Sequence, residues 1–335
     1  MRFGASTINW HFLPDKKAFD SSGYGRVRAA EINLTNERKR QMTITKFLDP
    51  KNDIAFKKIF GTKKNKDILI HFLNDMIVFR EGKPIVDVTF LKTIQDPEAM
   101  AKKTSIVDIL CEDQDKNTYV VEMQVAQHKG FEKRAQYYAS KAYVSQMEKG
   151  GIYENLKEVI FIAIANFTMF PQKESYNSDH VILVRENHQH DLKDFSFTFL
   201  ELEKFTKTKD QLVSMIEKWA YYFKHAEETS EDDLHKIFEK DVIIQRAYEE
   251  LDRFHWKEEE LRAYEAVVKH EMDYQASLDF KFEQGIQKGK SEGEREALVK
   301  VAKNMLKQGL SIQNISSATG LSAREVKKIQ EEGKK

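Results

Sequence analysis

The sequence predicts a mixed α/β core, in which helices pack on a central sheet. Residues 104–125 contain two β-branched runs separated by turn-forming residues, which is the pattern of two paired antiparallel strands. Residues 159–165 form a continuous apolar run, which is typical of a strand buried on both faces. Apolar residues at helical spacing precede the hairpin and also separate it from this run. The expected order is therefore helix, three strands, helix, strand.

The composition is that of a globular protein with polar helices. The 335 residues are 41% hydrophobic and 32% charged, which allows one full core and an accessory domain. The net charge is zero, so any contact with nucleic acid would have to come from local basic patches. The lysines of residues 57–66 form one such cluster and Lys102 and Lys103 form another, although solvated surface explains each equally well.

Cysteine content and hydropathy favour a cytoplasmic protein. The single cysteine, Cys111, rules out an intramolecular disulfide and suits a reducing compartment. No apolar run approaches the roughly 18 residues that are needed to span a bilayer. The N-terminus lacks the compact apolar block of a signal peptide. We therefore expect no membrane partner.

The first 41 residues and the helices after them have different patterns. Residues 1–41 show no clear period, and we expect a disordered extension or an artefact of an upstream start site, with a domain beginning at residue 42. A short helix follows, capped by Asn52 or Asp53. Asp53 leans toward its buried side, so a capping role and a role in a site both stay open. The apolar stripes of this helix and of the next are Ala55, Phe56, Ile59 and Phe60, then Leu69, Phe72, Leu73 and Met76.

The hairpin places two carboxylates opposite each other. If Glu112 pairs with Thr118 across the turn, the ladder continues until Asp108 faces Glu122. Their Cβ atoms would then lie roughly 5 Å apart, and like charges at that position destabilise a ladder. A divalent cation between them would reverse the sign of the interaction, because hard cations bind carboxylate oxygens.

Alternation assigns the hairpin residues to two faces. One face is expected to be apolar and to suit a core; it holds Val107, Ile109, Cys111, Val121, Met123 and Val125. Asp108, Glu122 and Gln124 fall on the other face. A plainly solvated face would explain these polar residues, but Ile106, Leu110 and Val120 lie on the same side and argue against it.

Further elements are expected around the hairpin and in the second half of the chain. Strands are predicted at residues 85–91 and 181–184 and at the alternation of Phe195, Phe197 and Phe199. A helix over residues 131–149, which carries Arg134, should end at Gly150-Gly151. The core domain is therefore assigned to residues 42–225.

The remainder of the chain is predicted to be helical and polar. Residues 226–295 are expected to form a helical linker, in which three glycines at four-residue spacing suggest close packing on a partner, or a hinge. Residues 296–335 are expected to form a small unit: a helix over 298–306, a helix capped by Ser311, a turn at Gly320 and a last helix. This pattern fits a helix-turn-helix, and it fits a helical packing unit without a role in DNA binding equally well.

Four sequence blocks occur in order along the chain: NDIAFKKIF at residues 52–60, IVD at 106–108, VEMQ at 121–124, and residues 143–153 with Tyr143, Gln146 and Tyr153. Together they resemble the recombination-promoting nuclease family, whose members are also labelled as transposases of the PD-(D/E)XK nuclease type. The resemblance runs from about residue 47 to residue 205, and the glycine-spaced helix and the C-terminal unit are also similar. It implies a restriction-endonuclease-like fold: a mixed sheet flanked by helices, with a helical C-terminal extension.

The resemblance also implies roles for individual residues. Asp108 and Glu122 become the catalytic acids and metal ligands, and Asp53 the acid of the first helix. Gln124 stands where the wider superfamily usually has lysine, so it could only orient a water or a phosphate by hydrogen bonds. Lys57 could restore the missing positive charge. Arg134 could pair with a phosphate, although an arginine on the solvated side of a helix is the plain alternative.

The function implied is a Mg²⁺-dependent endodeoxyribonuclease, with Mn²⁺ able to substitute, associated with recombination or mobile elements. DNA is the expected partner, and a homodimer would suit a double-strand cut, which needs two active sites or two events. The alternative function is a non-catalytic DNA-binding or regulatory protein that uses the nuclease core as a scaffold.

Overall fold

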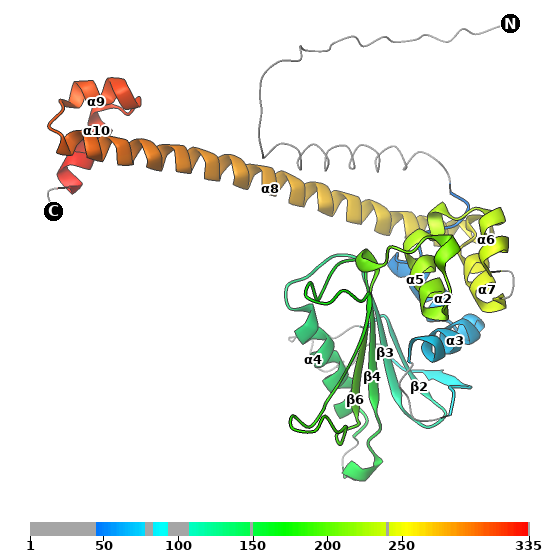
Figure 1. Cartoon of the computed structure of the whole chain (residues 1–335). Coiled ribbons are helices and arrows are strands. Elements are labelled where there is room, and N and C mark those ends of the chain that lie inside the picture. The colour runs from blue at the N-terminus through cyan, green and yellow to red at the C-terminus, as the bar shows by residue number, and fades with distance from the viewer. Residues whose placement is uncertain (1–44, 78–82, 93–106, 148–149, 239–240, 334–335) are drawn as a thin grey trace, which may run out of the picture. The chain divides into compact units, whose positions relative to one another are not determined.

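The computed structural model describes residues 45–77, 83–92, 107–147, 150–238 and 241–333 (Figure 1). The expected N-terminal extension, residues 1–41, lies outside them, as do Lys102, Lys103 and Ile106. In the part of the chain that is described, no helix is long and apolar enough to cross a membrane.

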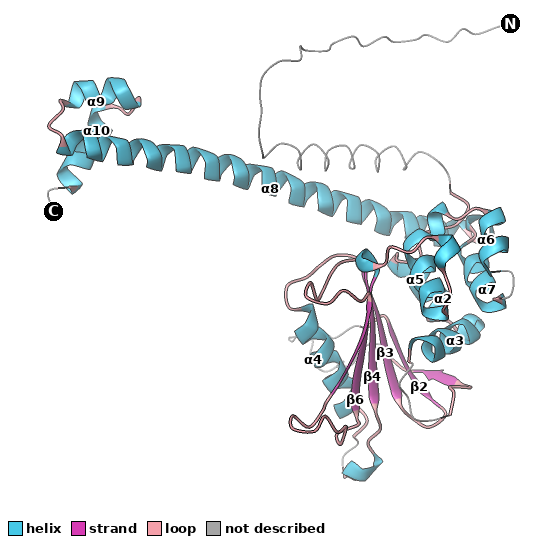
Figure 2. Ribbon diagram, in the orientation of Figure 1, coloured by secondary structure: helices cyan, strands magenta, loops and turns pink. Residues whose placement is uncertain are grey.

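A six-stranded mixed sheet forms the centre of the described fold (Figure 2). The strands are β1 (Val88–Phe90), β2 (Ile109–Asp113), β3 (Thr118–Gln124), β4 (Val159–Ala165), β5 (Asn177–Val181) and β6 (Phe195–Glu201). Their order is β1-β2-β3-β4-β6-β5. The first three strands are antiparallel, β3, β4 and β6 run parallel, and β5 is antiparallel to β6. All residues of β4 are buried, as its apolar run predicts.

Helices cover both faces of this sheet and continue beyond it. They are α2 (Asp53–Phe60), α3 (Lys66–Met76), α4 (Phe131–Val144), α5 (Met215–His225), α6 (Glu231–Phe238), α7 (Val242–Leu251), α8 (Glu258–Lys307), α9 (Ile312–Thr319) and α10 (Ala323–Glu332). The prediction of a mixed sheet flanked by helices, with a helical C-terminal extension, is confirmed.

The hairpin register agrees with the prediction. Glu112 faces Thr118, and the ladder continues to the pair Ile109 and Val121. The turn is stabilised by Asp113, whose carboxylate accepts the backbone N–H groups of Asp115 and Asn117 at 2.8 and 2.9 Å. This side-chain capping of the turn fixes the loop length, and with it the register.

The predicted assignment of hairpin residues to the two faces is correct within the strands and wrong beyond their ends. Ile109, Cys111, Val121 and Met123 join the larger core cluster, as expected. Val107, however, packs in the cluster on the opposite face, and Val125 is 38% exposed. Both residues lie outside the strands, where alternation with a period of two no longer applies.

Two other strand predictions need correction in their extent. The strand expected over residues 85–91 is shorter and spans only Val88–Phe90. Of residues 181–184, only Val181 is in a strand, because β5 ends there after pairing with Ser196 of β6. The helix expected over 131–149 ends as α4 at Val144.

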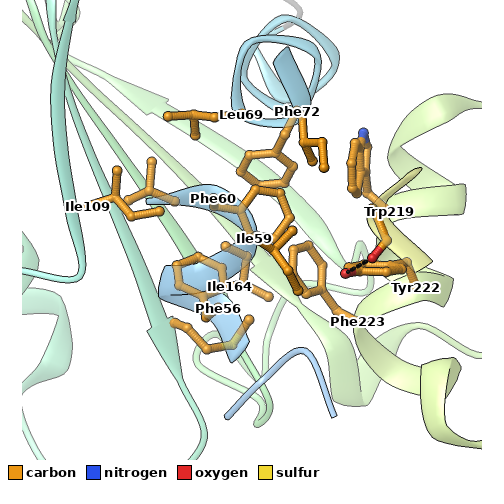
Figure 3. Packing of buried hydrophobic residues seen from close by; sticks show 14 of the residues in the cluster. Phe56, Ile59, Phe60, Leu69, Phe72, Ile109, Ile164, Trp219, Tyr222 and Phe223 are labelled. Atoms are coloured by element: carbon orange, nitrogen blue, oxygen red, sulfur yellow. Dashed lines mark hydrogen bonds between the residues drawn. The ribbon is translucent and has the colours of Figure 1, made fainter. Parts of the chain in front are cut away.

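The larger core lies between one sheet face and helices α2, α3, α5 and α7, with the start of α8. An aromatic cluster fills it (Figure 3), in which the Phe60 ring centroid is 5.3 Å from that of Phe72 and 5.7 Å from that of Phe223. Trp219 packs edge-on against Phe72 at 5.4 Å and donates its indole N–H to Asp75 at 2.8 Å. These contacts hold α2 against the sheet, and α2 carries two of the predicted site residues.

The opposite face of the sheet is covered by α4 (Figure 2). Its buried stripe is Phe131, Ala135, Ala139 and Ala142, at helical spacing. The three alanines allow the helix backbone to lie close to β3 and β4, because a methyl group is the smallest side chain that can fill the contact. This close packing brings the first turn of α4 to the end of β3.

Helix α8 is continuous from Glu258 to Lys307. The range expected as a linker, 226–295, therefore begins with residues of the main core, and its expected end lies inside α8. Those core residues are Ala226, Ile244, Ala247, Tyr248, Leu251, Trp256 and Tyr264. The three spaced glycines lie within the helix, and a Cβ added at any of them would meet no described atom within 4 Å.

The end of α8, α9 and α10 enclose a separate small core. It contains Ala302, Ile315, Leu321, Val326 and Ile329. Ser311 caps α9 and Ser322 caps α10, each accepting a backbone N–H of its helix. Gly320 ends α9 at a φ of 72°, where glycine avoids the strain of a Cβ. The predicted helices and turn of this unit are present, with its first helix being the last part of α8.

Candidate active site

The two hairpin acids lie side by side at the edge where β2 begins. Asp108 immediately precedes β2, and Glu122 lies near the end of β3. Oδ2 of Asp108 accepts the backbone N–H of Met123 at 2.9 Å. The backbone N–H of Asp108 in turn donates to the carboxylate of Glu122. Each carboxyl thus accepts a hydrogen bond from the backbone beside the other acid.

Burial distinguishes this pair from an ordinary polar face. Glu122 is only 3% exposed, and the Asp108 side chain is 18% exposed. The plainly solvated face considered as an alternative is therefore wrong. Among the described residues, no group donates a hydrogen bond to Oε1 of Glu122, although this atom is buried. A buried carboxylate oxygen without a hydrogen-bond partner is costly, so the presence of an acid at this position calls for a functional explanation.

The environment raises the pKa of both acids. Burial is the largest cause for Glu122, followed by the charge of Asp108, and together they raise its pKa to about 8. Burial also raises the pKa of Asp108, against the opposing effects of the Met123 N–H and the charge of Lys57. Two carboxyls that resist ionising side by side are a favourable place for a cation.

Gln124 connects Glu122 to a positive charge. Its Nε2 donates to Oε2 of Glu122 at 2.9 Å, and its Oε1 accepts a hydrogen bond from Nη2 of Arg134. The guanidinium carbon of Arg134 lies 4.8 Å from the ring centroid of Phe131 and 5.9 Å from that of Tyr138. The alternative of a merely solvated Arg134 is therefore wrong, because its guanidinium lies near two rings and donates a hydrogen bond to Gln124.

Helix α2 contributes a second cation from the other side of the sheet edge. Asn52 is the N-cap, with its side chain accepting the N–H of Ile54 at 3.0 Å, so Asp53 is the first helical residue and not the cap. Nζ of Lys57 lies 2.6 Å from Oδ1 of Asp53 and 3.6 Å from Oδ1 of Asp108. Lys57 therefore connects the two aspartates.

The charge of Lys57 is stabilised in this position. Burial lowers its pKa, but the hydrogen bond and charge of Asp53 and the charge of Asp108 more than offset this, and the pKa is raised. Lys57 is consequently protonated at neutral pH and acts as a fixed positive charge rather than as a base.

The three carboxylates predicted as metal ligands do not form a single group. Within the described ranges, no cluster of three or more His, Cys, Asp or Glu residues is arranged to hold a metal ion. Lys57 lies between Asp53 and Asp108. Asp108 and Glu122 remain as a pair, and this suffices for Mg²⁺, which commonly uses one or two carboxylates and takes its other ligands from water and phosphate. The unpartnered Oε1 of Glu122 fits such an ion.

One site residue was not predicted from the sequence. Burial raises the pKa of the Tyr138 hydroxyl against the opposing charge of Arg134, and the charges of Glu122 and Asp108 raise it further, so this tyrosine lies within the electrostatic reach of the site. Its position four residues after Arg134 puts both on one side of α4, so the helical spacing was the available signal.

Comparison with protein families agrees with this geometry. The family described as PD-(D/E)XK nuclease family transposase matches residues 50–281, which include all six strands and every site residue above. The C-terminal HTH domain of the Rpn/YhgA-like nuclease family matches residues 295–331. No curated protein and no solved structure matches the chain. Because the first match covers more than half of the sequence, the chain belongs to the PD-(D/E)XK nuclease family transposases.

Proposed function

We propose that this protein is a metal-dependent DNA endonuclease that hydrolyses phosphodiester bonds in recombination or in the movement of mobile elements. The observation that carries the proposal is the buried pair Asp108 and Glu122, with Oε1 of Glu122 unpartnered among the described residues. Two neighbouring buried carboxyls are costly when both are ionised, and a bound divalent cation would offset that cost. A nuclease of this family needs such a cation at the scissile phosphate.

Mg²⁺ is the proposed ion, with Mn²⁺ able to replace it, and Asp108 and Glu122 are the residues that would hold it. When bound, such an ion lowers the pKa of a coordinated water and stabilises negative charge on phosphoryl oxygens. The backbone N–H groups of Met123 and Asp108 fix both carboxylates in place before the ion arrives. The role of Asp53 as a third ligand stays a prediction; in this conformation its carboxylate orients Lys57.

The two cations beside the acids are proposed to bind the DNA phosphate. Arg134 can present a planar pair of donors to a phosphate, whereas Lys57 supplies a compact charge. Gln124 is proposed to hold Arg134 next to Glu122, since it accepts from the one and donates to the other. Arg134 on α4 and Lys57 on α2 thus supply the positive charge that a lysine at position 124 would provide.

The C-terminal unit is proposed to bind DNA through its helix-turn-helix. Its second helix, α10, has its buried side at Val326 and Ile329, and Arg324, Lys327 and Lys328 are exposed. A helix of this kind can enter a major groove while cationic side chains contact phosphates. A homodimer, which would supply two active sites for a double-strand cut, stays a proposal.

The binding of a metal ion can be tested without any DNA. The melting temperature of the full chain is measured with EDTA and with Mg²⁺ or Mn²⁺, because an ion that binds only the folded state stabilises it by about 2.7 kcal/mol at a concentration one hundred times Kd. The wild type should melt at a higher temperature with the metal, and Asp108→Asn should not respond.

A matched control is Glu112→Gln, which removes a carboxylate from the same hairpin. Glu112 pairs with Lys116 and not with the site. This variant should keep the full response to the metal. An equal response in Asp108→Asn would show that the metal binds elsewhere, and it would leave the scaffold alternative as the better account.

A further inference from the structure

The outer side of α4 carries cations and an aromatic ring next to the candidate active site. Residues 125–147 contain four lysines and arginines, namely Lys129, Lys133, Arg134 and Lys141, against one acid, Glu132. Tyr137 is 49% exposed, and Lys129 and Lys133 are also exposed. The tyrosine–lysine face, defined as Lys133, Tyr137 and Lys141 at four-residue spacing on α4, is therefore positively charged and offers an open ring.

This face is continuous with the site through direct contacts. Arg134 donates to Gln124, and its guanidinium carbon lies 5.9 Å from the Tyr138 ring centroid. The rings of Tyr138 and Tyr137 are 6.1 Å apart, and Nζ of Lys141 lies 5.8 Å from the Tyr137 centroid. A chain of side-chain contacts thus leads from Tyr137 through Tyr138, Arg134 and Gln124 to Glu122.

The arrangement of charge and ring identifies the chemistry of the ligand. Lysines attract a polyanion, and an exposed tyrosine ring gains from stacking against a flat, apolar surface. An unpaired nucleotide offers both, because its phosphate is anionic and both faces of its base are free. In a duplex the bases are stacked on one another, so Tyr137 would find no free base face and only the lysines would contribute.

We propose that the tyrosine–lysine face binds single-stranded DNA, with a base stacked on Tyr137 and phosphates on the lysines. That the bound strand is then delivered to Asp108 and Glu122 rests on the proposed function. The binding itself does not, and it can be measured where no cleavage occurs. The substrate of the nuclease would accordingly be a strand that is unpaired beside the cut.

The test is a pair of binding titrations on the full chain in EDTA. Fluorescence anisotropy is followed with a labelled oligo-dT of about 20 nucleotides, and separately with a duplex of the same length. Tyr137→Ala should weaken binding of oligo-dT about tenfold and leave duplex binding unchanged, since stacking on one base is lost. Tyr137→Phe should bind oligo-dT as the wild type does, because the ring is retained.

Two further variants distinguish stacking on Tyr137 from the loss of any exposed tyrosine and from the loss of a positive charge. Tyr274→Ala is the matched control, because Tyr274 lies on α8 and is similarly exposed, at 51%; it should change neither affinity. Lys133→Ala should weaken binding of both ligands and reduce the salt dependence of oligo-dT binding by about 0.7 in log–log slope.

Three results with the variants would each overturn the proposal. These are an unchanged oligo-dT affinity in Tyr137→Ala, an equal loss for oligo-dT and duplex, and an equal loss in Tyr274→Ala. Absence of oligo-dT binding by the wild type would overturn it as well. A chain that binds oligo-dT through Tyr137 but cleaves no DNA with Mg²⁺ would contradict the nuclease function and leave this inference standing.

Discussion

Replacing Glu122 with glutamine should stabilise the metal-free protein in alkaline solution. The substitution keeps the size of the side chain and its ability to accept the N–H of Asp108, but it removes the acid whose pKa burial and Asp108 raise to about 8. A carboxyl that titrates higher in the folded state contributes stability below its unfolded pKa of 4.5, and this contribution is lost as the pH rises through about 8. Glutamine does not titrate, so the variant avoids the loss.

The size of the effect follows from those two pKa values. Each pH unit between them removes about 1.4 kcal/mol from the free energy of unfolding. At pH 8 the wild type should therefore have lost about 4 kcal/mol relative to Glu122→Gln, and at pH 5 less than about 1 kcal/mol. For a protein of this size the difference at pH 8 corresponds to a melting temperature roughly 10 °C higher in the variant.

The assay is thermal and urea unfolding in EDTA at pH 5 and pH 8, with Glu112→Gln beside it. The control should follow the wild type at both pH values, because Glu112 is paired with Lys116 at the other end of the hairpin. Mg²⁺ should then raise the melting temperature of the wild type at pH 8 and leave Glu122→Gln unchanged. Equal stability of the wild type and Glu122→Gln at both pH values would refute the burial of an ionisable pair at this site.

Three further predictions concern the core, the cation of α2 and the C-terminal unit. Phe60→Ala should lower the free energy of unfolding by about 3–5 kcal/mol in urea titrations, because Phe60 is fully buried among four aromatic rings; a loss below about 1 kcal/mol would contradict this packing. Lys57→Met should reduce kcat/KM for DNA cleavage at least about tenfold without lowering the melting temperature, since the charge next to Asp108 is lost; unchanged kinetics would remove Lys57 from the site. Val326→Asp should unfold the small C-terminal core and weaken duplex binding, while the main thermal transition stays unchanged; retained duplex affinity would show that the helix-turn-helix does not carry it.

The local sequence pattern was sufficient to predict the hairpin with its register and the buried strand β4. A turn of fixed length and a period of two determine which hairpin residues face one another, so the pairing of Glu112 with Thr118 and the meeting of Asp108 with Glu122 could be read from the chain. The same pattern fails for Val107 and Val125, because a sequence does not mark where a ladder stops.

The cations of the site depend on packing between distant elements. Lys57 reaches Asp108 because an aromatic core holds α2 against the sheet, and Arg134 reaches Gln124 because three alanines let α4 lie close to β3. Neither contact has a signature in local spacing. Only the resemblance to a family suggested that these residues belong together.

The local sequence pattern also did not predict that α8 is one continuous helix. Glycine costs up to about 1 kcal/mol in a helix, and three of them within nine residues suggested close packing on a partner, or a hinge. The flanking residues of α8 are good helix formers, and α8 contains no proline or other strong terminating signal before Gly309. Helix α8 therefore continues to Lys307 and ends only where the C-terminal unit turns at Gly309.

Cleavage of supercoiled plasmid by the purified full chain tests the central claim most directly. Reactions contain Mg²⁺ or EDTA, and Asp108→Ala, Glu122→Ala and the control Glu112→Gln are run beside the wild type after each has been shown to melt cooperatively. The account predicts nicking that requires Mg²⁺, is lost in both site variants and is retained in Glu112→Gln. A folded wild type that binds DNA but leaves the plasmid intact, or site variants that cut at the wild-type rate, would contradict it.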